Sequence, residues 1–264
     1  MKKTIFDFLS LKGKRGLSVL TCYDYLTAKT MDEAGIDMIL VGDSLGNVVM
    51  GYDNTLAVTV EDMIHHGQAV CRGAQNTFVM VDMPFMSYQP SVRDAVINAG
   101  RIIRETNCQA VKLEGGVEYA DRIKAITEAG IPVVAHIGMT PQSFNALGGF
   151  KVQGKTEKSA QKILDDAKAV VEAGAFAVTL ECVPESIAAQ ITESTDAITI
   201  GIGAGNKCDA QVLVWQDMAG YSNGFVPKFV KQYANVHDTL LEAFKQYKEE
   251  VANHTFPDKE HTFH

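Results

Sequence analysis

Short apolar segments recur along this chain, and longer amphipathic segments separate them. Seven of the apolar segments are short and rich in β-branched residues, as buried strands are. They span residues 17–22, 38–42, 78–82, 110–114, 132–136, 175–181 and 197–202, and an eighth strand is expected at 212–215. Strands that alternate with helices form a parallel sheet with right-handed crossovers. This alternation therefore limits the chain to an α/β fold.

The segments between these strands are predicted to be helices. Three of them lead to a glycine suited to ending a helix: residues 23–34 to Gly35, 118–129 to Gly130 and 158–173 to Gly174. A further helix is predicted over 236–252, whereas the helix between the last two strands is expected to be short or missing. Seven or eight such units favour a closed (β/α)8 barrel, the TIM barrel, over an open doubly wound sheet.

The length of 264 residues suits one barrel domain. No change of composition and no Pro/Ser-rich linker marks a second domain, so residues 1–264 are predicted to form a single TIM-barrel domain, with extensions at 1–16 and 253–264. The longest irregular stretch between them runs from 140 to 156. Because it follows the fifth strand, it is expected to be a functional loop on the active-site face.

Charge and cysteine content argue against several classes of protein. The formal net charge is −8 and no long Lys/Arg run occurs, which disfavours a nucleic-acid partner. No window of about 18 apolar residues exists, so no membrane-spanning helix is expected. The five cysteines are odd in number and form no CxxC pair. They disfavour a disulfide framework or structural zinc site and favour a reducing cytoplasm.

Ionisable residues stand at five successive strand ends. They are Asp43, Asp82, Lys112, Glu114, His136 and Glu181. In a parallel barrel these ends meet on one face, where barrel active sites are built. Any single one could be the polar end of a strand that re-enters solvent. The set of six indicates a site.

Three of these residues, Asp43, Asp82 and Glu114, are carboxylates with hard oxygen donors. Carboxylates about 4 Å apart repel by roughly 4 kcal/mol at an effective dielectric near 20, and Lys112 compensates only one charge. Such a cluster either takes up protons or holds a cation, and Mg²⁺ prefers these ligands. His136 could indicate zinc, or could be a hydrogen-bonded core histidine, but the oxygen-rich set favours Mg²⁺.

A bound Mg²⁺ with open coordination positions suits a 2-oxo acid as substrate. The ion would stabilise the enolate formed when C3 loses a proton, and Lys112 would add positive charge at the same oxygens. Glu181, outside the expected ligand cluster, is the predicted base; the alternative is that it forms a salt bridge with a basic neighbour. Cys182 is a poor candidate nucleophile, because the adjacent Glu181 disfavours a thiolate.

Several ordered motifs resemble those of the ketopantoate hydroxymethyltransferase family. They include Val41–Gly46, Asp82–Met86, Val111–Gly116, His136–Ser143 and Leu180–Pro184. The resemblance extends over nearly the whole chain.

This resemblance implies an enzyme that opens pantothenate, and hence coenzyme A, synthesis. It would convert 3-methyl-2-oxobutanoate and 5,10-methylenetetrahydrofolate to 2-dehydropantoate and tetrahydrofolate. The positions that match the family's site are the metal-site residues Asp43, Asp82 and Glu114, the oxo-acid contacts Asp43, Ser44, Asp82 and Lys112, and the proton acceptor Glu181. The resemblance also implies a homodecamer.

Two other functions remain as alternatives. A Mg²⁺-dependent lyase or mutase of the phosphoenolpyruvate mutase/isocitrate lyase type would share the enolate but cleave or rearrange a C–C or C–P bond. Many such enzymes carry a cysteine loop near the fifth strand, and residues 137–156 contain no cysteine. A non-catalytic scaffold is the second alternative, but it would have no use for buried carboxylates that repel one another.

Overall fold

The computed structural model describes residues 2–149, 151–222 and 224–263, so Phe150 in the predicted functional loop lies outside the described residues. The chain divides into two compact units, Met1–Val214 and Trp215–His264. The first unit contains the whole barrel. The prediction of a single domain over residues 1–264 stays a prediction for the second unit, which we describe separately.

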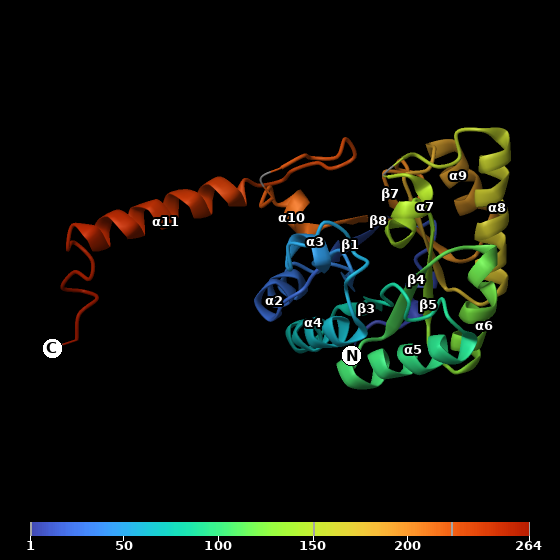
Figure 1. Ribbon diagram of the computed structural model, residues 1–264, viewed down its shortest axis with the longest axis horizontal. Helices are drawn as coiled ribbons and strands as arrows, with labels where there is room; N and C mark the ends of the chain where they lie inside the picture. Colours follow the sequence, from blue (N-terminus) through green and yellow to red (C-terminus); the bar gives the residue numbers. More distant parts are fainter. Residues whose placement is uncertain (1, 150, 223, 264) are drawn as a thin grey trace. The chain divides into compact units, whose positions relative to one another are not determined.

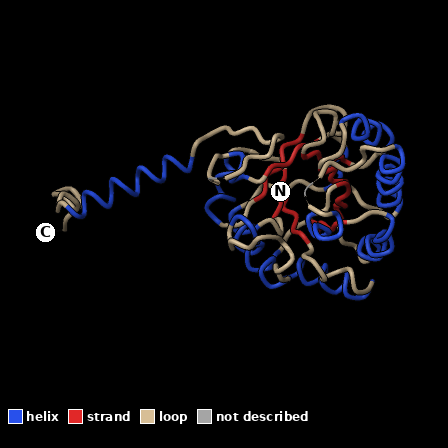
Figure 2. The backbone as a smooth tube through the Cα atoms, turned by 45° about the horizontal axis from the view of Figure 1, so that its top comes forward, coloured by secondary structure: helices blue, strands red, loops and turns tan. Residues whose placement is uncertain are grey.

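Eight parallel strands form a closed barrel in the order of the sequence. They are Leu17–Thr21 (β1), Met38–Val41 (β2), Phe78–Asp82 (β3), Ala110–Glu114 (β4), Val133–Gly138 (β5), Ala177–Glu181 (β6), Ile198–Ile202 (β7) and Ala210–Leu213 (β8). The strands lie inside a ring of helices (Figure 2). The predicted (β/α)8 barrel is thus confirmed.

The helices mostly follow the strands in alternation (Figure 1). The α-helices are Ile5–Leu9 (α1), Tyr25–Glu33 (α2), Leu45–Val48 (α3), Val60–Gly73 (α4), Val92–Thr106 (α5), Ala120–Glu128 (α6), Phe144–Leu147 (α7), Glu157–Glu172 (α8), Glu185–Ser194 (α9), Trp215–Met218 (α10) and Val236–Ala252 (α11). Two 3-10 helices cover Val117–Tyr119 (η1) and Pro141–Ser143 (η2). The 140–156 stretch is therefore less irregular than predicted, because η2 and α7 lie within it.

Glycines end three of these helices, as the sequence predicts. Gly35, Gly130 and Gly174 follow α2, α6 and α8 with φ of 75°, 85° and 102°. Residues with side chains rarely adopt such backbone angles, so glycine stops each helix at little steric cost. Residues 203–209, all of them described, contain no helix between β7 and β8, which confirms the expected gap.

The eighth strand begins two residues earlier than predicted. Ala210 pairs with Leu17 of β1 and with Ile200 of β7, and these two pairings close the barrel. Closure therefore sets the strand's position, and α10 already begins at Trp215. The prediction of residues 212–215 was wrong because a local apolar pattern carries no information about barrel register.

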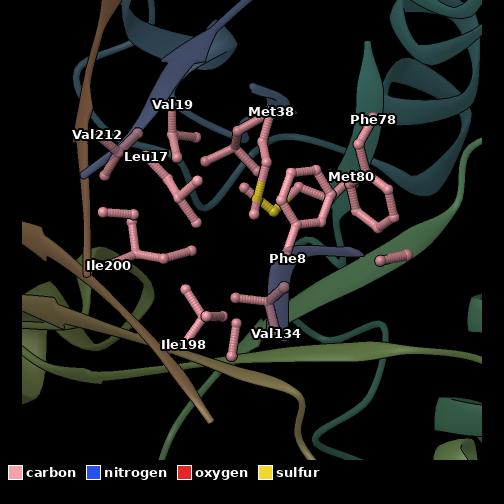
Figure 3. Packing of buried hydrophobic residues seen from close by; sticks show 14 of the residues in the cluster. Phe8, Leu17, Val19, Met38, Phe78, Met80, Val134, Ile198, Ile200 and Val212 are labelled. Atoms are coloured by element: carbon pink, nitrogen blue, oxygen red, sulfur yellow. The ribbon is translucent and has the colours of Figure 1, made fainter. Parts of the chain in front are cut away.

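Helix α1 covers the amino-terminal end of the barrel. Its Phe8 is fully buried and makes an edge-on contact with Phe78, with ring centroids 5.3 Å apart. Leu17, Met38 and other residues near the strand starts surround it (Figure 3). The predicted N-terminal extension of residues 1–16 thus includes part of the core.

The second unit contains α10 and α11. Helix α11, described in full, buries none of its residues, and Phe244 and Tyr247 on it are largely exposed. Its span matches the predicted helix at 236–252. None of the helices in the described part of the chain has the length and apolar character of a membrane-spanning segment.

Candidate active site

Inward-facing side chains change from apolar to charged along the barrel strands. Alternate residues of a strand share one face. These inner positions read Phe78, Met80 and Asp82 on β3; Ala110, Lys112 and Glu114 on β4; and Ala177, Thr179 and Glu181 on β6. The apolar members fill the core and the charged members stand at the carboxyl ends. The inward-facing positions of these strands therefore contribute side chains to both the core and the site.

Asp82 and Lys112 form a buried ion pair at adjacent positions of β3 and β4. Strand register places them side by side, and Lys112 Nζ donates to Asp82 Oδ1. The backbone N–H of Asp43 donates to the other oxygen, Oδ2, at 3.0 Å. Burial lowers the pKa of Lys112, but the charges of Asp82, Glu114 and Asp43 outweigh it, so that pKa is raised and the lysine stays charged.

Asp43 follows β2 and lies with its side chain buried in the same cluster. Burial, and then the charges of Asp82 and Glu114, raise the pKa of Asp43 to about 8. Its Oδ2 accepts a hydrogen bond of 2.9 Å from the side-chain amide of Gln142. The next residue, Ser44, shares a hydrogen bond of 2.8 Å with the buried hydroxyl of Tyr23.

His136 on β5 joins the acidic cluster to Glu181. Its Nδ1 lies 3.5 Å from Glu114 Oε1, and its Nε2 lies 3.1 Å from Glu181 Oε2. Burial and the charge of Lys112 lower the pKa of His136, but the two carboxylates outweigh them and raise it to about 9. The side chain of Glu181 is 14% exposed, against 3% for Glu114, so Glu181 is the more accessible carboxylate.

The structure brings together all six residues that the strand ends predicted. It also adds two that sequence reasoning missed, Gln142 and Tyr88, both buried on loops. The Tyr88 hydroxyl accepts from Glu114 N at 3.1 Å and lies 2.9 Å from Gln142 Oε1. Gln142 lies within one of the recognised motifs and Tyr88 closely follows another, but no strand periodicity predicts the direction of a loop side chain.

Cys182 lies beside the site but does not have the character of a nucleophile. Burial and the charge of Glu181 raise the pKa of its thiol to about 11. The thiolate is therefore scarce at neutral pH, as the sequence argument expected.

The charges at the site fit a divalent cation. Three buried carboxyl groups, Asp43, Asp82 and Glu114, face only two buried cationic groups, Lys112 and His136, and the raised pKa of Asp43 reflects the lack of a third cationic partner. Within the described residues, no group of three or more His, Cys, Asp and Glu side chains is arranged to hold a metal ion by itself. Mg²⁺ does not require such a cage, because it is usually held by one or two carboxylates, with water and substrate oxygens completing its shell.

Comparison with known proteins identifies the family. The family model described as "Ketopantoate hydroxymethyltransferase" matches residues 2–259. The chain belongs to this family. A curated 3-methyl-2-oxobutanoate hydroxymethyltransferase of Clostridium novyi is 58% identical over 264 residues, covering 100% of this chain and 96% of the relative. The enzyme of the same name from Enterococcus faecalis is also 58% identical, with the same coverage.

Solved structures with similar folds come from another group of barrels. A phosphonopyruvate hydrolase matches with a TM-score of 0.65 and 13% identity, covering 98% of this chain and 93% of that one. Phosphoenolpyruvate phosphomutase from Streptomyces platensis matches with a TM-score of 0.63 and 14% identity, covering 95% and 88%. At these identities the likeness supports the barrel fold alone, and membership of the ketopantoate hydroxymethyltransferase family rests on the closer relatives.

Proposed function

We propose that this protein transfers a one-carbon unit from 5,10-methylenetetrahydrofolate to C3 of 3-methyl-2-oxobutanoate. With one water molecule consumed, the products are 2-dehydropantoate and tetrahydrofolate. The observation that carries the proposal is the buried acidic cluster around Lys112, with the more accessible Glu181 next to it, in a chain of this family. A reaction that develops negative charge on substrate oxygens needs such a site.

Mg²⁺ is part of the proposal, with Asp43, Asp82 and Glu114 as the residues that would hold it. One of the similar barrels, a phosphonopyruvate hydrolase, has been solved with oxalate and Mg²⁺. When bound, the ion supplies positive charge to the oxygens of the oxo acid. The excess of buried carboxylates over cationic side chains supports its presence.

The protein's own residues then bind the oxo acid and move its proton. Lys112 and Ser44 bind the substrate oxygens, together with Asp43 and Asp82 at the same end of the barrel. Glu181 takes the proton from C3, and the enolate carbon forms the new C–C bond to the methylene carbon of the folate. Both C–N bonds of that carbon break, water supplies the hydroxyl oxygen, and the two nitrogens of tetrahydrofolate take up the proton from C3 and one proton from water. His136, with Nε2 3.1 Å from Glu181 Oε2, places a cationic group beside this carboxylate.

We also propose a cytoplasmic enzyme, as the cysteine content favours, and a homodecamer, as the family resemblance implies. The exposed Phe244 and Tyr247 of α11 are apolar side chains that another subunit would cover. Sedimentation equilibrium of the full chain tests this: a mass about tenfold that of one chain supports the decamer, and a monomer mass contradicts it.

Exchange of the C3 proton tests the proposed chemistry. Proton NMR follows deuterium uptake from D₂O into 3-methyl-2-oxobutanoate, with Mg²⁺ and with EDTA. We expect exchange that EDTA abolishes and that Glu181→Gln slows by about 10²- to 10⁴-fold, because a positioned base contributes about that factor. Glu172→Gln, at an exposed ion pair with Lys168 on α8, is the matched control and keeps the wild-type rate.

Two results would contradict the proposal. Unchanged exchange in Glu181→Gln would assign the base to another residue. If the wild type shows neither exchange with Mg²⁺ nor dehydropantoate when the folate co-substrate is added, the proposed reaction is wrong.

A further inference from the structure

Gln142 occupies the second position of η2, in the loop between β5 and α8, yet its side chain points into the acidic cluster. It is 6% exposed. Its amide nitrogen donates to Asp43 Oδ2 at 2.9 Å and to the Met83 carbonyl oxygen at 3.0 Å. Its amide oxygen lies 2.9 Å from the Tyr88 hydroxyl and accepts from Gln89 Nε2 at 3.0 Å. Both ends of the amide are therefore fully engaged.

The chemistry of these neighbours fixes the orientation of the amide. The Met83 carbonyl can only accept a hydrogen bond, so the Gln142 nitrogen must face it and, with it, Asp43. On the other side, the Gln89 amide nitrogen can only donate, which requires the oxygen there. A rotation of the amide by 180° would break both contacts.

The backbone of Gln142 contacts a second carboxylate of the cluster. Its N–H donates to Glu114 Oε2 at 2.9 Å. A single residue thus holds one oxygen of Asp43 and one oxygen of Glu114, although Asp43 follows β2 and Glu114 ends β4. Hydrogen bonds of this kind orient metal-ligating carboxylates, and their loss typically weakens metal binding about 10- to 100-fold.

We propose that Gln142 is a positioning residue that sets the orientation of Asp43 and Glu114 for a divalent cation. The inference rests on the metal site of the proposed function. The Gln142 amide restrains rotation of the Asp43 side chain through Oδ2, which leaves Oδ1 for the cation. Gln142 belongs to the loop between β5 and α8. A movement of this loop would therefore change the orientation of Asp43 and Glu114.

Mn²⁺ binding to the metal-free protein tests this role without any turnover. Free Mn²⁺ is measured by electron paramagnetic resonance during titration of the full chain. Gln142→Leu removes the side-chain contacts but keeps the backbone N–H that reaches Glu114. We expect this variant to bind Mn²⁺ about 10- to 100-fold more weakly than the wild type.

Two further variants make the test specific. Gln153→Leu makes the same substitution in the same loop, where the amide donates to the Lys151 carbonyl at 3.0 Å; we expect its affinity to change less than twofold. Gln89→Leu removes the amide that donates to the Gln142 oxygen at 3.0 Å, and we expect it to weaken Mn²⁺ binding by a smaller factor than Gln142→Leu. It serves as the informative variant if Gln142→Leu does not fold.

The outcomes separate this inference from the proposed function. If the wild type binds Mn²⁺ and both Gln142→Leu and Gln89→Leu bind it equally well, the role of Gln142 is overturned and the metal site stands. If Gln153→Leu weakens binding as much as Gln142→Leu does, the effect belongs to the loop as a whole and the inference is again overturned. If the wild type binds no Mn²⁺, the metal site and the role of Gln142 both fall.

Discussion

Buried carboxylates at the two ends of the barrel differ in the number of cationic partners available to them. At the amino end, Asp37 accepts hydrogen bonds from Arg15 at 2.6 and 2.9 Å and from Lys3 at 2.9 Å. Asp209 accepts from Lys12 at 2.6 Å. Each of these two carboxylates has at least one cationic partner. Burial raises the pKa of Asp37, but hydrogen bonds from Arg15, Lys3 and the Ser18 backbone outweigh it and hold that pKa well below its usual value.

At the carboxyl end, carboxylates outnumber cationic side chains. Asp43, Asp82 and Glu114 share Lys112 and His136, and the pKa of Asp43 is raised to about 8. The comparison indicates that carboxylates with their own cationic partners stabilise the fold at one end, whereas the surplus of carboxylates at the other end fits the proposed metal binding and catalysis. Barrel active sites occur at the carboxyl ends of the strands, and stabilising residues at the opposite end.

The largest effect at the amino end is expected from Phe8→Ala. Removing this fully buried ring leaves a cavity against Phe78, so the free energy of unfolding should fall by about 3–5 kcal/mol. Urea unfolding measures it. Phe6→Ala, on the same helix but 73% exposed, should change stability little. If Phe8→Ala instead abolishes C3 exchange in protein that remains folded, the assignment of stability to the amino end and of chemistry to the carboxyl end is wrong.

A smaller effect is expected from Asp37→Asn. The substitution leaves Arg15, Lys3 and Ser18 without their charged acceptor, and we expect a loss of about 1–3 kcal/mol in the free energy of unfolding. The rate of C3 exchange per folded molecule should stay at the wild-type value. Asp121→Asn, which changes a carboxylate that is 57% exposed and pairs with Arg122, is the control and should change stability by less than about 0.5 kcal/mol.

The smallest expected effect is the pH dependence of the difference in unfolding free energy between the wild type and Asp37→Asn. Because the folded-state pKa of Asp37 lies below its ordinary value of 3.8, its ion pairs stabilise the protein fully above that pH. The stabilisation is lost as pH falls from 3.8 through the lower folded-state pKa. Unfolding free energies of wild type and Asp37→Asn should therefore converge in acid. If the difference instead stays constant down to the lowest pH at which the protein folds, the charge of Asp37 does not contribute to the free energy of unfolding.

The sequence predicts most of the barrel and most of the site for one physical reason. A buried parallel strand is a short apolar run, and its polar carboxyl end points to the common face, so Asp82, Lys112, Glu114 and Glu181 could be found without coordinates. Ser44 was added only by family resemblance.

The features that the sequence did not predict depend on the tertiary path of the chain. Gln142 lies in a loop, and only the folded loop brings its amide to Asp43. The limits of β8 depend on pairing with β1 and β7, which local hydrophobicity does not encode. Helix α11 was predicted correctly as a helix, but an amphipathic pattern does not say which surface covers its apolar face.

The contrast between the two ends is tested most directly by comparing the unfolding free energies of metal-free Asp43→Asn and Asp37→Asn with that of the wild type. Urea unfolding in EDTA near pH 7 gives both free energies. We predict that Asp43→Asn raises the free energy of unfolding by about 1–4 kcal/mol, since it removes a buried carboxyl whose folded-state pKa is raised, while C3 exchange with Mg²⁺ is lost. Asp37→Asn should lower it and keep exchange. A fall in stability for both variants would contradict the account, because the carboxylates at the carboxyl end would then stabilise the fold as those at the amino end do.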